Sequence, residues 1–477
     1  MTNHPLVLTF DCGTQSIRAL LVDKDGNIVA KEQKPFAPYY SIKPGYAEQK
    51  PSVYRNAMKD VSRHIHEHNP SLVDDIIAVT ITTIRDTVVC LDKNGQPIRD
   101  FIVWLDQREA KCETPLPFMS RVAFELVGMT GQLLDSVASQ IGHIPFDFQK
   151  KRWFDVKNIK FPIFGVPPEK LINIVEPGAV LGTISKAVSD EFLIKENLPV
   201  IATGSDKGCE TLGSGVLDND MASLSFGTTA TIQTTIRKYI EPQQFMPAYP
   251  GLVTGTYNPE IQIYRGFWMV SWFKKEFAEK EVTQAPGLGV SPEELLNRRL
   301  KEIPPGSDGL MLQPYWAPLL KSPEAKGSII GFSGEHTRIH IYKAIIEGIG
   351  YGLIEGMKSL EKRTHTTIKG LTVSGGGSQS DEICQITADM FGKPVYKIQT
   401  YEACGLGSSM VAFVALGIYK DYPEAIAHMV RYTKTFSPDP IIHEIYDELY
   451  EKVYTKIYQS LKPLYHELRV ISKKRKI

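Results

Sequence analysis

The chain has 477 residues, 42% of them hydrophobic, and it carries 54 basic and 54 acidic residues. This length and composition predict two or more domains with large apolar cores, and the balanced charge argues against a nucleic-acid partner. Six cysteines without a CxxC pair, no bilayer-length apolar run and no signal peptide favour a cytoplasmic protein without zinc, disulfides or a membrane partner.

The first predicted element is a hairpin with a polar turn. Two runs rich in aliphatic residues, 6–10 and 17–22, flank a turn that contains Asp11 and Gly13. The turn is open to two interpretations. Asp, Gly, Thr and Ser occur in turns for backbone reasons alone. Alternatively, backbone N–H groups and hydroxyls in a tight turn bind phosphate, and the adjacent carboxylate holds Mg²⁺.

Strands and helices follow one another in the next part of the chain. An apolar face with helical spacing predicts an amphipathic helix over 52–68, which is followed by a strand at 76–84 and a hairpin at 86–98. This order of elements predicts an α/β architecture with a mixed sheet.

The opening hairpin has a second copy near residue 221. Residues 198–215, LPVIATGSDKGCETLGSG, predict a strand, a glycine-rich turn with one acid, and a helix of small residues. Residues 221–236, MASLSFGTTATIQTTI, then predict a strand, a Gly-Thr turn and another strand, with Phe226 where the first copy has Asp11. The duplication predicts two similar domains, each presenting a phosphate-binding turn to the cleft between them.

The last part of the chain alternates helices with glycine-rich turns. A long helix is predicted over 336–363, then a strand, a triple glycine and a helix over 368–392. A small-residue turn leads into an apolar helix over 401–419. Aromatic and aliphatic residues near helical spacing predict a final helix over 450–468, broken at Pro463.

The order of these motifs resembles that of a known family. Seven motifs follow one another along the chain: FDCGTQSIRA, VWLDQREA, GSDKGCETLGSG, SLSFGTT, GEHTRIHIYKAIIEGIGYG, VSGGGSQSDEICQITADMFGKPV and EACGLGSS. From about Leu6 to Tyr419 the sequence resembles the FGGY family of carbohydrate kinases. The resemblance implies an α/β fold of two ribonuclease-H-like domains, of the actin and hexokinase ATPase type, with a cleft between them.

The resemblance also implies a division of labour. Residues 1–216 would form an N-terminal domain with the sugar site and the catalytic base, 217–420 a C-terminal domain with the nucleotide site, and 421–477 a helical extension packed on the second domain. The implied activity is transfer of the γ-phosphate of ATP to a hydroxyl of a small sugar or polyol, with ATP and Mg²⁺ as cofactors. Family members are often dimers, so a homodimer is compatible with the resemblance.

For the nucleotide, the resemblance assigns Mg²⁺ to Asp11 and the phosphates and adenine to the glycine-rich turns. Each assignment has a plainer alternative: a surface charge for Arg18, an ordinary hairpin turn for Gly-Thr, and a strand-to-helix turn for the triple glycine. Ser380 stands where glycerol kinases have an adenine-side Asn. The implied nucleotide-binding residues are Thr14, Gln15, Ser16, Arg18, Gly227, Thr228, Thr229, Gly375, Gly376, Gly377 and Ser380.

For the acceptor, the resemblance implies that Asp206 is the general base that takes the proton of the attacking hydroxyl. The alternative is an Asp that caps a helix. A local likeness to glycerol kinases aligns Arg85 and Asp86 with residues that grip polyol hydroxyls. Trp104 is a candidate for the C–H face of the sugar, or else a core residue. Lys207 replaces the Gln of glycerol kinases and would favour a polar or anionic substrate, or point to solvent.

Two departures from the family pattern leave the acceptor open. Only 27 positions separate Trp104 from Gly131, where family members usually carry a longer segment, so we expect a more open sugar site. The Met-His-Gly run of xylulose kinases is missing, which favours a polyol over a xylulose- or ribulose-type ketose. A non-catalytic sugar or nucleotide sensor and another ATPase of the same superfold are the remaining alternatives.

Overall fold

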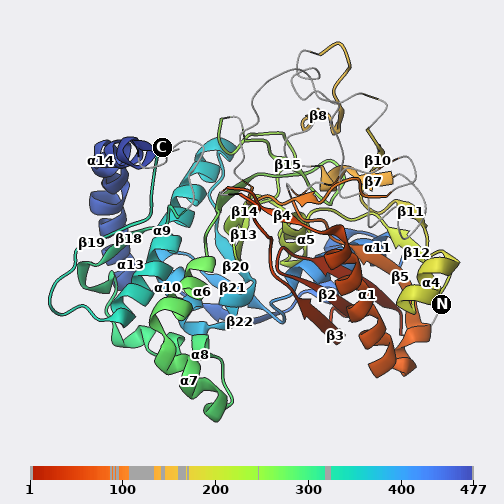
Figure 1. Ribbon diagram of the computed structural model, residues 1–477, viewed down its shortest axis with the longest axis horizontal. Helices are drawn as coiled ribbons and strands as arrows, with labels where there is room; N and C mark the ends of the chain where they lie inside the picture. Colours follow the sequence, from red (N-terminus) through yellow and green to blue (C-terminus); the bar gives the residue numbers. More distant parts are fainter. Residues whose placement is uncertain are drawn as a thin grey trace.

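The computed structural model describes residues 4–43, 45–85, 87, 89, 92, 96–106, 134–140, 145–158, 168, 171–244, 246–316 and 324–474. The chain forms two α/β halves that lie side by side, each built around a six-stranded sheet (Figure 1). The duplicated α/β architecture predicted from the sequence is therefore confirmed.

The first sheet begins with the predicted hairpin and has the order β11-β12-β5-β1-β2-β3. Alternate residues of its buried strand β1 face two different cores: Leu8 and Phe10 pack in the same core as residues of helix α1, and Val7 packs with residues of α11. The expected hairpin at 86–98 lies largely outside the described residues. The bounds are β1 Leu6–Cys12, β2 Ser16–Asp23, β3 Ile28–Pro35, α1 Pro51–His68, β5 Ile76–Ile81, β11 Val180–Thr183, α4 Lys186–Phe192 and β12 Pro199–Ile201.

The second sheet repeats the pairing pattern of the first. β13 is antiparallel to β14 and parallel to β20, as β1 is antiparallel to β2 and parallel to β5. In both sheets the outermost strand beyond the parallel core is antiparallel. The order is β17 (Glu260–Ile263), β14 (Ala230–Gln233), β13 (Met221–Phe226), β20 (Gly370–Ser374), β21 (Val395–Ile398) and β22 (Tyr432–Phe436).

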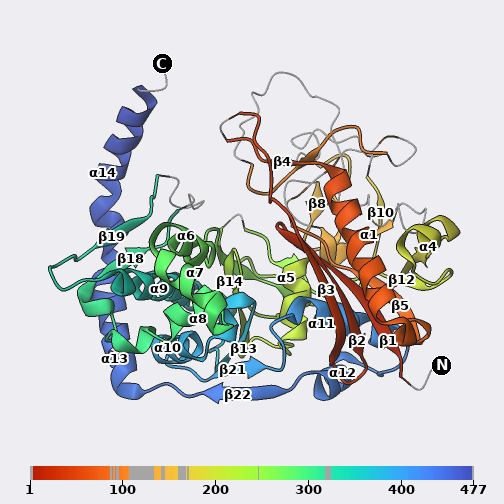
Figure 2. The same cartoon turned by 60° about the horizontal axis from the view of Figure 1, so that its bottom comes forward.

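Two helices cross where the halves meet. α5 (Asp206–Gly213) follows β12 of the first sheet, and α11 (Ala403–Ala415) belongs to the second half in sequence but packs against β1 of the first sheet (Figure 2). The crossing brings backbone against backbone, because a Cβ added to Gly407 would lie 1.9 Å from the carbonyl oxygen of Cys209. Glycine at this point therefore sets how closely the halves approach.

The remaining helices of the second half differ from expectation in two places. Helix α14 (Thr455–Lys474) runs through Pro463 without a break, because a proline removes only one backbone hydrogen bond and neighbouring turns hold the helix. The segment expected to be only helical also contributes β22. No helix of the described ranges is long and apolar enough to cross a membrane. The bounds are α6 Trp268–Phe277, α7 Glu279–Leu288, α8 Pro292–Asn297, α9 Arg338–Thr364, α10 Asp381–Phe391, α12 Tyr422–Met429 and α13 Pro440–Leu449.

Short strands complete the fold outside the two main sheets. Within the described ranges they form five two-stranded pairs, in addition to 3-10 turns. The pairs are β4 (Glu48–Gln49) with β6 (Phe101–Ile102), β7 (Leu134–Ser136) with β10 (Asn173–Val175), β8 (Phe146–Asp147) with β9 (Arg152–Trp153), β15 (Tyr249–Pro250) with β16 (Tyr257–Asn258), and β18 (Met311–Gln313) with β19 (Ser328–Ile330).

Candidate active site

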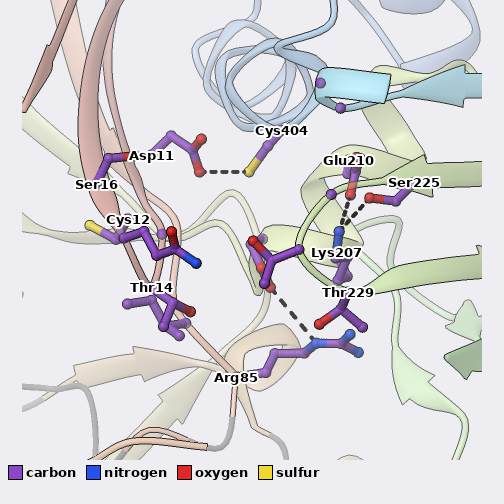
Figure 3. A pocket seen from close by; sticks show the side chains of 18 of the residues that line it. Asp11, Cys12, Thr14, Ser16, Arg85, Lys207, Glu210, Ser225, Thr229 and Cys404 are labelled. Atoms are coloured by element: carbon purple, nitrogen blue, oxygen red, sulfur yellow. Dashed lines mark hydrogen bonds and ion pairs between the residues drawn. The ribbon is translucent and has the colours of Figure 1, made fainter. Parts of the chain in front are cut away.

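A cleft of about 650 Å³ lies between the halves and is lined by residues of both. Its walls are the β1–β2 turn, the β13–β14 turn, the glycines after β20, and the residues at the N-terminal ends of α5 and α11 (Figure 3). The two duplicated turns therefore face one space, as the duplication predicts.

The β1–β2 turn is tight and carries hydroxyls on its cleft side. The backbone N–H of Gly13 donates to the carbonyl oxygen of Ser16 at 2.9 Å. The hydroxyl of Thr14 accepts from Nε1 of Trp104 at 2.9 Å, and the hydroxyl of Ser16 accepts from Nε2 of Gln33 at 3.0 Å. Trp104 thus ties the segment after β6 to the β1–β2 turn.

Asp11 lies at the end of β1 with both carboxylate oxygens hydrogen-bonded. Oδ1 accepts from the hydroxyl of Thr82 at 3.1 Å and from the thiol of Cys404 at 3.0 Å. Oδ2 accepts from a terminal nitrogen of Arg18 at 2.9 Å, and Nε of Arg18 lies 3.4 Å from Glu402. Arg18 is therefore not an isolated surface charge, because it joins two buried carboxylates at the edge of the cleft.

The β13–β14 turn and the glycines after β20 form the opposite wall. Gly227, Thr228 and Thr229 line the cleft, and the carbonyl oxygen of Gly227 accepts from the N–H of Phe267 at 3.1 Å. Gly375 has φ = +77°, and a Cβ there would lie 3.0 Å from the carbonyl carbon of Phe226. Only glycine fits this position without strain, and its place between β20 and the turn leaves backbone exposed to the cleft.

Asp206 is the first residue of α5 and points into the cleft with 31% of its side chain exposed. Ser205, not Asp206, caps the helix, since its hydroxyl accepts from the N–H of Gly208 at 3.3 Å. Asp206 is therefore not the N-cap residue of α5. Burial raises the pKa of Asp206 to about 6, against the opposing charges of Arg85 and Lys207.

Arg85 is the cation that faces Asp206. Its Nε lies 3.7 Å from Oδ1 of Asp206, and its two terminal nitrogens both donate to the carboxylate of Glu260 on β17. Its guanidinium also stands 5.2 Å from the ring centre of Tyr249. Glu260 is held in turn by Nε2 of Gln233 at 2.8 Å. The positive charge of Arg85 is thus matched by a carboxylate from the other half.

Lys207 points away from Arg85, toward the second half (Figure 3). Its Nζ donates to Oε2 of Glu210 at 2.6 Å and to the hydroxyl of Ser225 at 2.5 Å. Burial lowers the pKa of Lys207, but the charges of Glu210 and Asp206 outweigh burial and leave the pKa above its usual value. Lys207 is therefore not the solvent-exposed charge of one alternative, because only 14% of its side chain is exposed.

The structure brings most of the predicted site residues together. Gly377 and Ser380 are not among the residues that line the cleft: a Cβ on Gly377 would meet the ring of Phe267 at 2.4 Å, and Ser380 caps α10 by accepting from the N–H of Ile383. Asp86 lies outside the described residues. The predicted residues in the cleft wall are Thr14, Gln15, Ser16, Arg18, Arg85, Trp104, Asp206, Lys207, Gly227, Thr228, Thr229, Gly375 and Gly376, together with Asp11.

Sequence reasoning missed several carboxylates and aromatic side chains. Glu210 and Glu402 line the cleft, and Glu260 holds Arg85. Tyr264 stacks on Trp104 with ring centres 6.4 Å apart. The alternation of polar and apolar residues in 260–263, Glu-Ile-Gln-Ile, was a usable signal, because it turns Glu260 and Gln262 to one face of a strand. Nothing in the sequence around Glu402 indicated an ion pair with Arg18.

Two family models match the chain, one for each half. The N-terminal domain of the FGGY family of carbohydrate kinases matches residues 6–139, and its C-terminal domain matches residues 222–416. The chain belongs to the FGGY family of carbohydrate kinases. It is therefore a phosphotransferase with an alcohol group as acceptor.

Relatives of this kinase match over nearly their whole length. The uncharacterized sugar kinase YgcE of Escherichia coli is 27% identical over 438 residues, which cover 91% of this chain and 89% of the relative. The gluconokinase of Bacillus subtilis is 23% identical and covers 92% of each chain. The crystal structure of gluconate kinase from Lactobacillus acidophilus superposes with a TM-score of 0.82 at 20% identity, over 98% of this chain and all of that one. The kinase thus has the fold of solved family members.

Proposed function

We propose that this kinase transfers the γ-phosphate of ATP to a hydroxyl of a small neutral sugar or polyol, with Asp206 as the general base. The single observation that carries the proposal is the position of Asp206, a carboxylate at the start of α5 that lines the same cleft as the β1–β2 and β13–β14 turns. An ionised carboxylate accepts the proton of the attacking hydroxyl as the bond to phosphorus forms.

The proposed donor site joins the two turns. Thr14, Gln15 and Ser16 would contact the β- and γ-phosphates from the first half, and the 227–229 turn would contact them from the second. Backbone N–H groups and hydroxyls in such turns are suited to phosphate oxygens. Gly375 and Gly376 would let backbone approach the nucleotide. On this proposal residues 1–216 hold mainly the sugar, and residues 217–420 hold mainly the nucleotide.

Asp11 fits a magnesium site of the kind that phosphate oxygens complete. The described residues contain no group of three or more His, Cys, Asp or Glu side chains arranged around a metal, so the ion would depend on ATP for most of its ligands. Mg²⁺ prefers one or two carboxylates together with phosphate and water oxygens. Asp11, which lines the cleft, would supply one carboxylate. When bound, Mg²⁺ neutralises charge on the β- and γ-phosphates.

The preference for a neutral acceptor rests on charge. Both terminal nitrogens of Arg85 donate hydrogen bonds to Glu260, and Asp206 adds a second negative charge beside Arg85. Lys207 is held by Glu210 on the phosphate side. Within the described part of the cleft, the two cations nearest Asp206 are thus each paired with a carboxylate, so the acceptor end has no net positive charge to balance the carboxylate of a sugar acid. Neutral hydroxyls, with Trp104 and Tyr264 as an aromatic wall for C–H groups, fit this end better.

A coupled ADP-release assay tests this proposal. Glycerol, erythritol, ribitol, xylulose and ribulose are compared with gluconate, using the wild type, Asp206→Asn and the surface control Asp190→Asn. We expect turnover with at least one neutral acceptor, little with gluconate, and loss of turnover only in Asp206→Asn. Turnover with gluconate alone would overturn the neutral-acceptor proposal, and ATP binding without any transfer would favour a non-catalytic sensor.

A further inference from the structure

Lys207 follows the proposed base, yet the two side chains diverge. Successive residues of a helix point about 100° apart, so Asp206 and Lys207 at the start of α5 serve different sides of the cleft. Asp206 faces Arg85. Lys207 reaches Ser225, the last but one residue of β13, close to the second of the proposed phosphate-binding turns.

The ammonium of Lys207 lies beside that turn. A Cβ built on Gly227 would be 4.0 Å from Nζ, and Lys207 and Gly227 both line the cleft. Only 14% of the lysine side chain is exposed. The position is therefore next to backbone that is suited to phosphate.

Two acceptors hold the ammonium in one orientation. Nζ donates to Glu210 at 2.6 Å and to Ser225 at 2.5 Å, and the other oxygen of Glu210 accepts from the hydroxyl of Ser374 at 2.6 Å. An ammonium has three protons, and the contacts described for Lys207 use two of them. A fixed cation with one remaining proton is preorganised to donate to an oxygen that enters the cleft.

We propose that Nζ of Lys207 contacts the γ-phosphoryl group of ATP and stabilises it during transfer. This inference rests on the proposed function. In the step, the acceptor oxygen forms a bond to the γ-phosphorus, and its proton passes to Asp206. The bond between the γ-phosphorus and the bridging oxygen breaks, and the electron pair leaves with ADP. Charge is spread over the three equatorial oxygens during this step, and a neighbouring cation stabilises it.

Replacement of the charge tests the proposal. Lys207→Met keeps the aliphatic stem and removes the ammonium. We expect kcat to fall about 100-fold, the loss typical of removing one preorganised donor to a transition state. Binding of MgADP with aluminium fluoride, a transition-state analogue, should weaken by about the same factor, and binding of MgADP alone by less than about threefold. A structural ion pair would instead weaken both complexes equally, and that result would overturn the proposal.

Glu210→Gln separates the cation from its ion pair. This variant removes the partner charge but keeps the ammonium, so we expect a smaller loss of kcat than in Lys207→Met. Equal losses in the two variants would mean that the pair, not the cation, matters. If Lys207→Met does not fold, Lys207→Arg gives the same comparison, with partial retention of analogue binding expected and full loss contradictory. Turnover of the wild type tests the proposed function separately. If the wild type phosphorylates an acceptor and Lys207→Met has the same kcat, this inference is overturned and the proposed function is not.

Discussion

Arg85 and Glu260 form a bidentate ion pair between the two halves, although 175 positions separate them in the chain. Arg85 lies shortly after β5 of the first sheet, and Glu260 is the first residue of β17 in the second sheet. Glu260 is 2% exposed and Arg85 is 12% exposed. The pair therefore links the two halves and also sets the balance of charge beside Asp206.

Glu260→Gln should destabilise the protein and change its choice of acceptor. The substitution leaves a buried guanidinium without its carboxylate, which costs about 3 kcal/mol of unfolding free energy. It also uncovers a positive charge beside Asp206, so the ratio of kcat/KM for gluconate to that for a neutral sugar should rise. Urea denaturation and the acceptor assay measure the two effects. The control Glu302→Gln removes an exposed pair with Arg299 and should change neither.

Activity should fall in acid because Asp206 must be ionised. Burial raises the pKa of Asp206 to about 6, and the protonated carboxyl cannot accept the proton of the acceptor. A profile of kcat/KM against pH should therefore be flat above about pH 7 and lose tenfold per pH unit below about pH 5. A profile that stays flat to pH 5 would contradict this role for Asp206.

The same raised pKa has a consequence for stability. The pKa of Asp206 in the folded state lies above its usual value, so the ionised carboxylate destabilises the fold. This destabilisation is complete well above pH 6 and decreases as the pH falls through 6, because the carboxyl becomes protonated. Asp206→Asn removes this cost. We expect its Tm to exceed that of the wild type at pH 8, with a smaller difference at pH 5. A lower Tm than the wild type at pH 8 would show that the carboxylate stabilises the fold.

Gly407→Ala should weaken the contact between the halves. The new methyl group would meet the carbonyl oxygen of Cys209, so α5 and α11 would have to separate. Overpacking of this kind costs about 1–3 kcal/mol. Gly287→Ala is the matched control, because Gly287 lies in helix α7 with open space around its Cβ position. Chemical denaturation should show a lower free energy of unfolding for Gly407→Ala and an unchanged one for Gly287→Ala. Equal denaturation midpoints for the two variants would contradict the close crossing of α5 and α11.

Trp104→Phe separates the two contacts of this side chain. The phenyl ring keeps the aromatic wall opposite Tyr264 but loses the hydrogen bond from Nε1 to the hydroxyl of Thr14. We expect a modest rise in KM for ATP, about three- to tenfold, since one hydrogen bond is worth about 1 kcal/mol. Trp104→Ala should in addition raise KM for the sugar. Steady-state kinetics with each substrate varied would contradict this account if Trp104→Phe changed only the sugar KM.

The sequence predicted those parts of the site that depend on local order. The hairpins that carry Asp11 and Gly227 were predictable, because strand pattern and turn residues lie within about 15 positions of one another. The partners of the charged groups were not. Arg85 meets Glu260, and Arg18 meets Glu402, only after the two halves assemble. Periodicity indicates which face a side chain occupies but not which distant side chain it meets, so the contact between Lys207 and Ser225 was not predicted.

The most direct test of the account follows both products in one reaction. Enzyme is mixed with MgATP and a neutral acceptor from the panel, and ADP and sugar phosphate are measured together for the wild type and Asp206→Asn. We predict equal amounts of ADP and sugar phosphate from the wild type, and a rate about 10³-fold lower from the variant with ATP binding retained. ADP without sugar phosphate, or a variant as fast as the wild type, would contradict Asp206 as the base of a sugar kinase.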